Sequence, residues 1–275
     1  QCGLAIFDLM SNHIYQTHKM GTLFLEMKRL TDQDKRKFDY NKFQKVIGPM
    51  LPVTNVLAVQ ETDAFESMST TFFWCFTRFV LPRNKVVING TPESNISIIL
   101  DKDIAGTVKL LELPETYKTD PFLKKNSPFL MEVCGKSILV LVVHGKNPKS
   151  KALEVFQKQK ELIEHYKGIH KFELEFMLGD SNLEKKHGYL PTQYAEAVGL
   201  QKCSNTEFTT NKQRSNLQGQ CGKNQLSQEE KDFIAGPKAL RNSGAILFPK
   251  VCNDMLPSPE HPTDHRGLVA KFVDL

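Results

Sequence analysis

The chain has 275 residues, of which 40% are hydrophobic and 24% are charged, a composition that excludes a disordered or fibrous protein. Its 36 basic and 31 acidic residues leave a net charge of +5, so an anionic partner is mildly favoured, although a dedicated nucleic-acid module is usually more basic. No apolar run reaches the roughly 18 residues of a membrane span, so we expect no transmembrane helix.

The six cysteines are widely spaced and form no CxxC pair. We therefore expect mainly free thiols, with a Cys203–Cys221 bridge across a polar loop as the open alternative. The opening residues lack the basic segment of a signal peptide, and Gln1 is not a native start. A cytoplasmic protein is favoured, and secretion stays open because a removed leader would not be seen. The glycosylation sequons at Asn89 and Asn95 are interpreted as chance matches.

Short apolar runs predict buried strands in the first half of the chain. The first covers residues 3–9 and the second covers residues 56–59. The Lys-rich stretch between them, residues 17–45, predicts loops and a helix. The segments "NKVVING" and "NISIILD" are rich in β-branched residues and flank an Asn-Gly turn, which predicts a hairpin.

A strand, a helix and a second strand are predicted in the middle of the chain. The strongest strand signal is the apolar run Ile138–Val143, which His144 follows at once. Apolar residues then recur at helical spacing over residues 152–166, and residues 172–178 are predicted to return to strand. This order is the crossover pattern of a layered α/β protein.

The polar composition of residues 201–231 predicts a surface loop that is functional or disordered. Short strands are expected in "KDFIAGP" and in the last residues, "HPTDHRGLVAKFVDL". The chain contains no internal repeat and no linker, so residues 1–275 predict a single domain.

Residues that can act on a phosphate or a metal ion lie at the ends of several predicted strands. They are Glu61, His144, Asp180 with Asn182, Asp232, and Asp264 with His265. Taken singly, each is more often a turn former or a helix cap. Taken together they favour one site, because ligands of layered α/β folds gather at strand ends.

The segments "VLAVQET", "LVVHGKN", "LGDSNLE", "KDFIAGP" and "PTDHRGLVAKF" follow each other in a known order. They resemble the endonuclease/exonuclease/phosphatase superfamily, which has the deoxyribonuclease-I-like fold. Its pattern is a Gln-Glu after a strand, a strand ending in His, a G-D-x-N, an Asp-aromatic pair and a terminal S-D-H. The resemblance runs from about Leu4 to the C-terminus and implies an α/β sandwich of four layers, in which two packed, mostly antiparallel or mixed sheets are flanked by helices.

The resemblance implies hydrolysis of a phosphoester by in-line attack of water with Mg²⁺ or Mn²⁺ as the cofactor. Glu61 would hold the cation, since hard ions prefer oxygen ligands. Asp180 would position or deprotonate the attacking water, and Asn182 would donate to the phosphoryl oxygens. His265 would contact the scissile phosphate, and Asp232 would accept from its other ring nitrogen.

Two further roles and two departures follow from the same pattern. His144 would be a second donor to the phosphoryl oxygens, and Asp264 would support the metal or its waters. The Asn that usually ends the first strand is replaced by Asp8 at about that place, with Asn12 a turn later, and the choice between them stays open. If Asp8 and His144 were both structural, the protein would bind substrate without turnover. Gly179 is expected to let the strand turn sharply before Asp180.

The net positive charge and the segment around Lys212 and Arg214 favour a nucleic-acid backbone over a lipid headgroup as the partner, with a solvated loop as an equally weighted alternative. Inositol-phosphatase members of the family carry a Trp-Cys-Asp-Arg segment shortly before the terminal motif, whereas Trp74 lies far upstream of that motif. The aromatic stretch around Trp74 fits a core strand better than an exposed platform for bases or a membrane. We therefore predict a nuclease-like phosphodiesterase. A lipid or small-molecule phosphoesterase is the second interpretation, and a non-catalytic binding protein on the same scaffold is the third.

Overall fold

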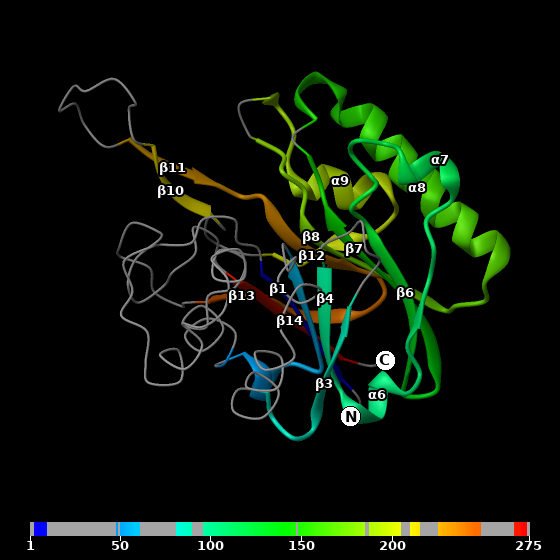
Figure 1. Ribbon diagram of the computed structural model, residues 1–275. Helices are drawn as coiled ribbons and strands as arrows, with labels where there is room; N and C mark the ends of the chain where they lie inside the picture. Colours follow the sequence, from blue (N-terminus) through cyan, green and yellow to red (C-terminus); the bar gives the residue numbers. More distant parts are fainter. Residues whose placement is uncertain are drawn as a thin grey trace, which may run out of the picture.

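Two six-stranded sheets pack face to face in the computed structural model of the chain (Figure 1). The structure describes residues 3–9, 48, 50–60, 81–89, 96–146, 148–184, 187–204, 210–214, 225–248 and 267–273. The Lys-rich stretch 17–45 and the aromatic stretch 70–82 lie outside these residues.

The first sheet, sheet A, has the strand order β13-β14-β1-β2-β4-β3. β1 and β2 are parallel, and the other neighbours are antiparallel. The predicted strands at residues 3–9 and 56–59 and the predicted β3–β4 hairpin are confirmed. The bounds are β1 Gly3–Leu9, β2 Val56–Gln60, β3 Lys85–Asn89, β4 Ile96–Asp101, β13 Arg241–Phe248 and β14 Gly267–Val273, with a short 3-10 helix, η2 Leu51–Val53, before β2.

The second sheet, sheet B, has the order β5-β6-β7-β8-β12-β9. Its central strands β7 and β8 are parallel and are joined through helix α8, as the crossover pattern predicts. The bounds are β5 Lys109–Leu110, β6 Ser127–Val133, β7 Lys136–His144, β8 Leu174–Asp180, β9 Gln201–Lys202 and β12 Asp232–Gly236.

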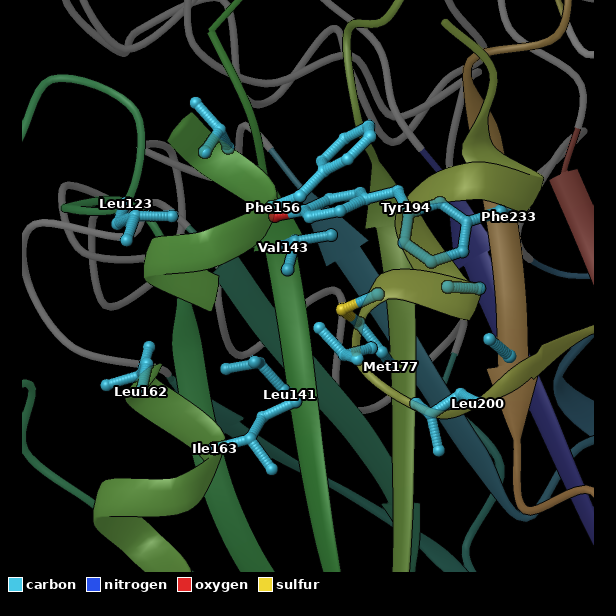
Figure 2. Packing of buried hydrophobic residues seen from close by; sticks show 14 of the residues in the cluster. Leu123, Leu141, Val143, Phe156, Leu162, Ile163, Met177, Tyr194, Leu200 and Phe233 are labelled. Carbon is cyan, nitrogen blue, oxygen red and sulfur yellow. The ribbon is translucent and has the colours of Figure 1, made fainter. Parts of the chain in front are cut away.

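Helices cover the outer face of sheet B. α8 (Ala152–Ile169) follows the 3-10 turn η3 (Lys149–Lys151), and α9 (Pro191–Ala197) lies beside it; the short α6 (Lys102–Ala105) and α7 (Glu115–Lys118) flank β5 in the chain. Figure 2 shows Phe156 of α8 against Tyr194 of α9 over β7 and β8, with their rings stacked at 4.9 Å. Burial of each large apolar side chain stabilises this layer by about 1.5–3 kcal/mol.

A separate apolar core lies between the two sheets. Alternate residues of each strand enter it, such as Ala58 of β2 and Val140 of β7. Phe176 of β8 and Phe272 of β14 meet there edge to face, with ring centroids 4.7 Å apart. Gly236 leaves room for these rings, since a Cβ at this position would lie 2.7 Å from each of them.

Residues 201–231 are not all loop, so that prediction is wrong in part. They include β9 and an antiparallel ribbon of β10 (Thr210–Arg214) and β11 (Gln225–Glu229), which extends away from the sandwich (Figure 1). No prediction covered β6, β13 or α9. Pro128 in β6 and the irregular register around Gly244 in β13 hide the usual strand pattern.

The prediction of free cysteines holds for one described residue and fails for the other. Cys203 is a buried free thiol, so the alternative of a Cys203–Cys221 bridge is wrong. Cys134, in the turn between β6 and β7, is disulfide-bonded. Among the described residues, no helix is long and apolar enough to cross a membrane.

Candidate active site

Three neighbouring strands of sheet B each place one polar residue at the same end of the sheet, where the three are paired in register. The register pairs His144, at the end of β7, with Asp180, at the end of β8, and pairs Asp180 with Asp232, at the start of β12. Their side chains are buried, with exposed fractions of 5%, 1% and 1%. We call these three residues the polar row. Strand pairing therefore brings together three of the residues that the sequence predicts for catalysis.

The polar row lies at one end of the core between the sheets. Leu178 and Ile234, two residues away along their strands, belong to this inner core. Val143 and Phe233, one residue away, instead pack under the helices on the outer face. Because side chains alternate along a strand, the row has the parity of the face directed at sheet A.

Asn182 joins the loops that follow β7 and β8. Its backbone has a positive φ of 49°, and its N–H donates to Asp180 Oδ1 at 2.5 Å. Its side-chain Nδ2 donates to the carbonyl oxygen of Gly145 at 2.7 Å, and the Gly145 N–H donates to the carbonyl of Asp180 at 2.7 Å. An amide nitrogen carries two hydrogens, and no described residue accepts the second one from Asn182. Its predicted role as a donor is therefore compatible with this geometry.

Gly179 is needed for its conformation and for space. Its φ is 133°, and a Cβ there would lie 1.9 Å from the carbonyl oxygen of Val143 and 2.4 Å from Gln60 Nε2. β8 continues through Gly179 to Asp180, so the expectation of a sharp turn at Gly179 is wrong. The positive φ at Asn182 lies beyond the strand end.

Gln60 is a residue of this site that the sequence did not assign. It ends β2 of sheet A, is 2% exposed, and donates from Nε2 to the carbonyl oxygen of Val143 at 2.7 Å. This bond crosses from sheet A to sheet B beside the polar row. The signal was present in "VLAVQET", where an amide ends an otherwise apolar strand directly before Glu61.

The start of β12 is held against the end of β8. Both the N–H and the hydroxyl of Ser181 donate to the carbonyl oxygen of Lys231, at 3.0 and 2.8 Å. The Lys231 ammonium also lies 3.8 Å from Glu184, whose carboxylate is 3.5 Å from His187 Nε2. These contacts support the position of Asp232 in the row.

Some of the remaining predicted residues lie elsewhere in the described structure, and the others lie outside it. Asp8 lies in β1, paired with Ala58 and Leu268, and β1 is in contact with β8 and β12. Lys212 and Arg214 lie in β10, on the ribbon that leads through β11 to β12. The residues outside the described part of the chain are Asn12, Glu61, Asp264 and His265.

The polar row has the donors that suit a hard cation. Asp180 and Asp232 are buried carboxylates directly opposite each other on antiparallel strands, so a bound cation would reduce the repulsion between them. Carboxylate oxygens are also the ligands that Mg²⁺ and Mn²⁺ prefer. Within the described ranges no three His, Cys, Asp or Glu residues form a group that would hold a metal ion, and Glu61 and Asp264 lie outside those ranges.

A cavity of about 470 Å³ lies at the other end of sheet A, between η2 and the strand ends. Asp101 in its lining accepts from Asn55 at 2.8 Å and Asn84 at 3.2 Å and pairs with Lys85 at 2.7 Å. None of the predicted site residues that the structure describes lines it.

No protein-family model and no curated protein sequence matches the chain. Solved structures do. Zebrafish (D. rerio) TDP2 complexed with single-strand DNA product has a TM-score of 0.57 at 15% identity, and the match covers 98% of each chain. ANGEL2, a 2',3'-cyclic phosphatase in complex with adenosine-2',3'-vanadate, has a TM-score of 0.55 at 12% identity and covers 98% of this chain and 95% of its own.

An endonuclease/exonuclease/phosphatase family protein from Leptotrichia buccalis is similar to the same degree, with a TM-score of 0.55 at 12% identity over 98% of this chain and 99% of its own. The two packed, mixed sheets agree with the sandwich that the family resemblance implies. The chain has the deoxyribonuclease-I-like fold.

Proposed function

We propose that residues 1–275 form a single catalytic domain that hydrolyses a phosphodiester with the help of Mg²⁺ or Mn²⁺, and that its substrate is a nucleic acid. The polar row carries this proposal. A buried histidine and two buried carboxylates in adjacent positions, with an amide donor beside them, are the groups needed to activate water and stabilise a phosphoryl group.

Asp180 is the residue that orients and deprotonates the attacking water. Its carboxylate is held by the backbone N–H of Asn182, at 2.5 Å, so its direction is set before substrate binds. The second amide hydrogen of Asn182 donates to a phosphoryl oxygen, and His144 is a further donor from the neighbouring strand. Charge that develops on the phosphoryl oxygens during in-line attack is stabilised by these donors.

Asp232 and His265 act together in the proposed reaction. Asp232 is buried at the start of β12. It accepts a hydrogen bond from one ring nitrogen of His265, and this directs the other ring nitrogen at the scissile phosphate. A histidine oriented in this way donates to the phosphate and protonates the leaving oxygen.

Glu61 is the principal proposed metal ligand, and Asp264 and Asp8 support the ion or its waters. Glu61 follows Gln60, whose side chain contacts the strand that carries His144. The bound cation supplies positive charge that neutralises the phosphate. The residues of this chain then bind the phosphoryl group, orient water and move protons.

A nucleic acid is favoured over a lipid headgroup for two reasons. Lys212 and Arg214 lie on the ribbon that leads through β11 to Asp232, and basic residues favour contact with a phosphate backbone. The TDP2 structure with the same fold contains a single-strand DNA product, and the ANGEL2 structure contains an adenosine-2',3'-vanadate.

The substrate assignment is tested with end-labelled single-stranded DNA, double-stranded DNA and RNA, each incubated with Mg²⁺ or Mn²⁺. EDTA and the His265→Ala variant are the controls. We expect at least one nucleic acid to be cleaved only with metal and only by the wild type. A folded protein that cleaves none of them but hydrolyses sphingomyelin or a phosphoinositide would contradict the nucleic-acid assignment. Salt-dependent binding without any turnover would contradict the enzymatic one.

A further inference from the structure

Gln60 connects the two sheets at the candidate active site. It is the last residue of β2 in sheet A, and its Nε2 donates to the carbonyl oxygen of Val143 in β7 of sheet B at 2.7 Å. Only 2% of Gln60 is exposed to solvent. The amide therefore bridges the two sheets in a buried environment, where a hydrogen bond is strong and its geometry is well defined.

The partner strand is shaped to receive this side chain. Gly179 pairs with Val143 in the parallel β7–β8 ladder. A Cβ at Gly179 would lie 2.4 Å from Gln60 Nε2, so the amide occupies space that a side chain at this position would take. The contact therefore needs both the glutamine in sheet A and the glycine in sheet B.

Gln60 has a catalytic candidate on each side of the contact. Glu61, the proposed metal ligand, is the next residue in the chain. Val143 is followed at once by His144, and Gly179 by Asp180, so the bond reaches sheet B one residue before the polar row. The Gln60 bond thus joins the strand that leads to the metal ligand to the strands that supply the water-activating and phosphate-binding residues.

We infer that Gln60 is a positioning residue, which sets the placement of Glu61 relative to Asp180 and His144 across the two sheets. This role rests on the proposed function. The proposed metal ligand directly follows a strand of sheet A in the sequence, whereas the carboxylate that activates water ends a strand of sheet B, so contacts between the sheets affect their relative placement. Residues that orient metal ligands in this way typically change metal affinity or activity by about 10- to 100-fold when they are lost.

The test compares two Gln→Met variants. Gln60→Met keeps the length and approximate shape of the side chain and removes the donor to Val143. Gln159→Met is the matched control, because Gln159 lies on the buried face of α8, is 0% exposed, and accepts from Asn126 at 2.9 Å and Tyr194 at 2.7 Å. The readouts are urea unfolding, Mn²⁺ binding by electron paramagnetic resonance, and the kcat and KM of metal-dependent hydrolysis.

We expect Gln60→Met to weaken Mn²⁺ binding and to lower kcat by about 10-fold or more with little change in KM. Gln159→Met is expected to lose stability while both values stay at the wild-type level. Wild-type Mn²⁺ affinity and kcat in Gln60→Met, with only a loss of stability, would overturn the positioning role alone. A wild-type protein that neither binds Mn²⁺ nor hydrolyses any phosphoester would overturn the proposed function itself.

Discussion

Gly179 combines an unusual backbone conformation with close contacts on two sides. Its φ of 133° is rarely adopted by other residues, and a Cβ would approach the Val143 carbonyl oxygen to 1.9 Å. We expect Gly179→Ala to lower the free energy of unfolding by at least about 2 kcal/mol, because backbone of both central strands would have to shift. Urea denaturation at neutral pH measures this change.

Gly168→Ala is the control for that substitution. Gly168 lies within α8, and a Cβ there would have nothing within 4 Å. Alanine is expected to raise the stability by about 0.5 kcal/mol, since glycine is the poorer helix former. Equal effects of the two substitutions would show that the close contacts at Gly179 carry no special cost.

Cys203 is expected to be unreactive in the folded protein. Burial raises the pKa of its thiol to about 12, so the reactive thiolate is scarce at neutral pH. Peptide mass spectrometry after iodoacetamide treatment should find Cys203 unmodified in buffer and alkylated in denaturing urea. Rapid alkylation under native conditions would show that this strand end opens readily.

An ion pair between Lys158 and Asp120 connects helix α8 to the segment before β6. Asp120 accepts from Lys158 Nζ at 2.7 Å and from the backbone N–H groups of Phe122 and Leu123. Burial tends to raise the pKa of Asp120, but the hydrogen bond from Lys158 and those from the backbone outweigh it and hold the pKa below its ordinary value of 3.8. The carboxylate therefore stabilises the fold above this value, and the contribution is lost as the pH falls below 3.8 toward the folded-state pKa.

Asp120→Asn tests this contribution at the level of the helix. At pH 7 the variant is expected to be less stable by about 1 kcal/mol, and the difference should shrink as the pH falls below 3.8. Glu154→Gln is the matched control, because Glu154 contacts the same lysine at 2.8 Å but is 48% exposed. Its effect should be smaller, and a pH-independent loss in Asp120→Asn would contradict the electrostatic explanation.

Elements with a dominant local pattern could be predicted from the sequence. The apolar run of β7 and the helical spacing in α8 gave their type and their approximate bounds. The polar strands β10 and β11 could not be predicted, because "TNKQR" and "QLSQE" carry no apolar alternation and form only by pairing with each other. Their existence depends on tertiary context, which a local pattern does not contain.

At the scale of the whole molecule, the candidate active site could be predicted only in part from the sequence. Motifs gave His144, Asp180 and Asp232 as residue types at strand ends, but their alignment follows from the register of β7, β8 and β12. Register is set by pairing between distant segments. The contact of Gln60 with Val143 likewise depends on how one sheet packs on the other, and no spacing in the sequence encodes it.

The most direct test of the account is the rate of metal-dependent phosphodiester hydrolysis by Asp180→Asn beside Asp120→Asn. Asparagine at position 180 keeps an oxygen that can accept from Asn182 but cannot take a proton from water. We predict that kcat falls by about 10² to 10⁴ in Asp180→Asn and stays at the wild-type value in Asp120→Asn. Wild-type hydrolysis by a folded Asp180→Asn variant, or hydrolysis that persists in EDTA, would contradict the proposal that Asp180 activates water in a metal-dependent reaction.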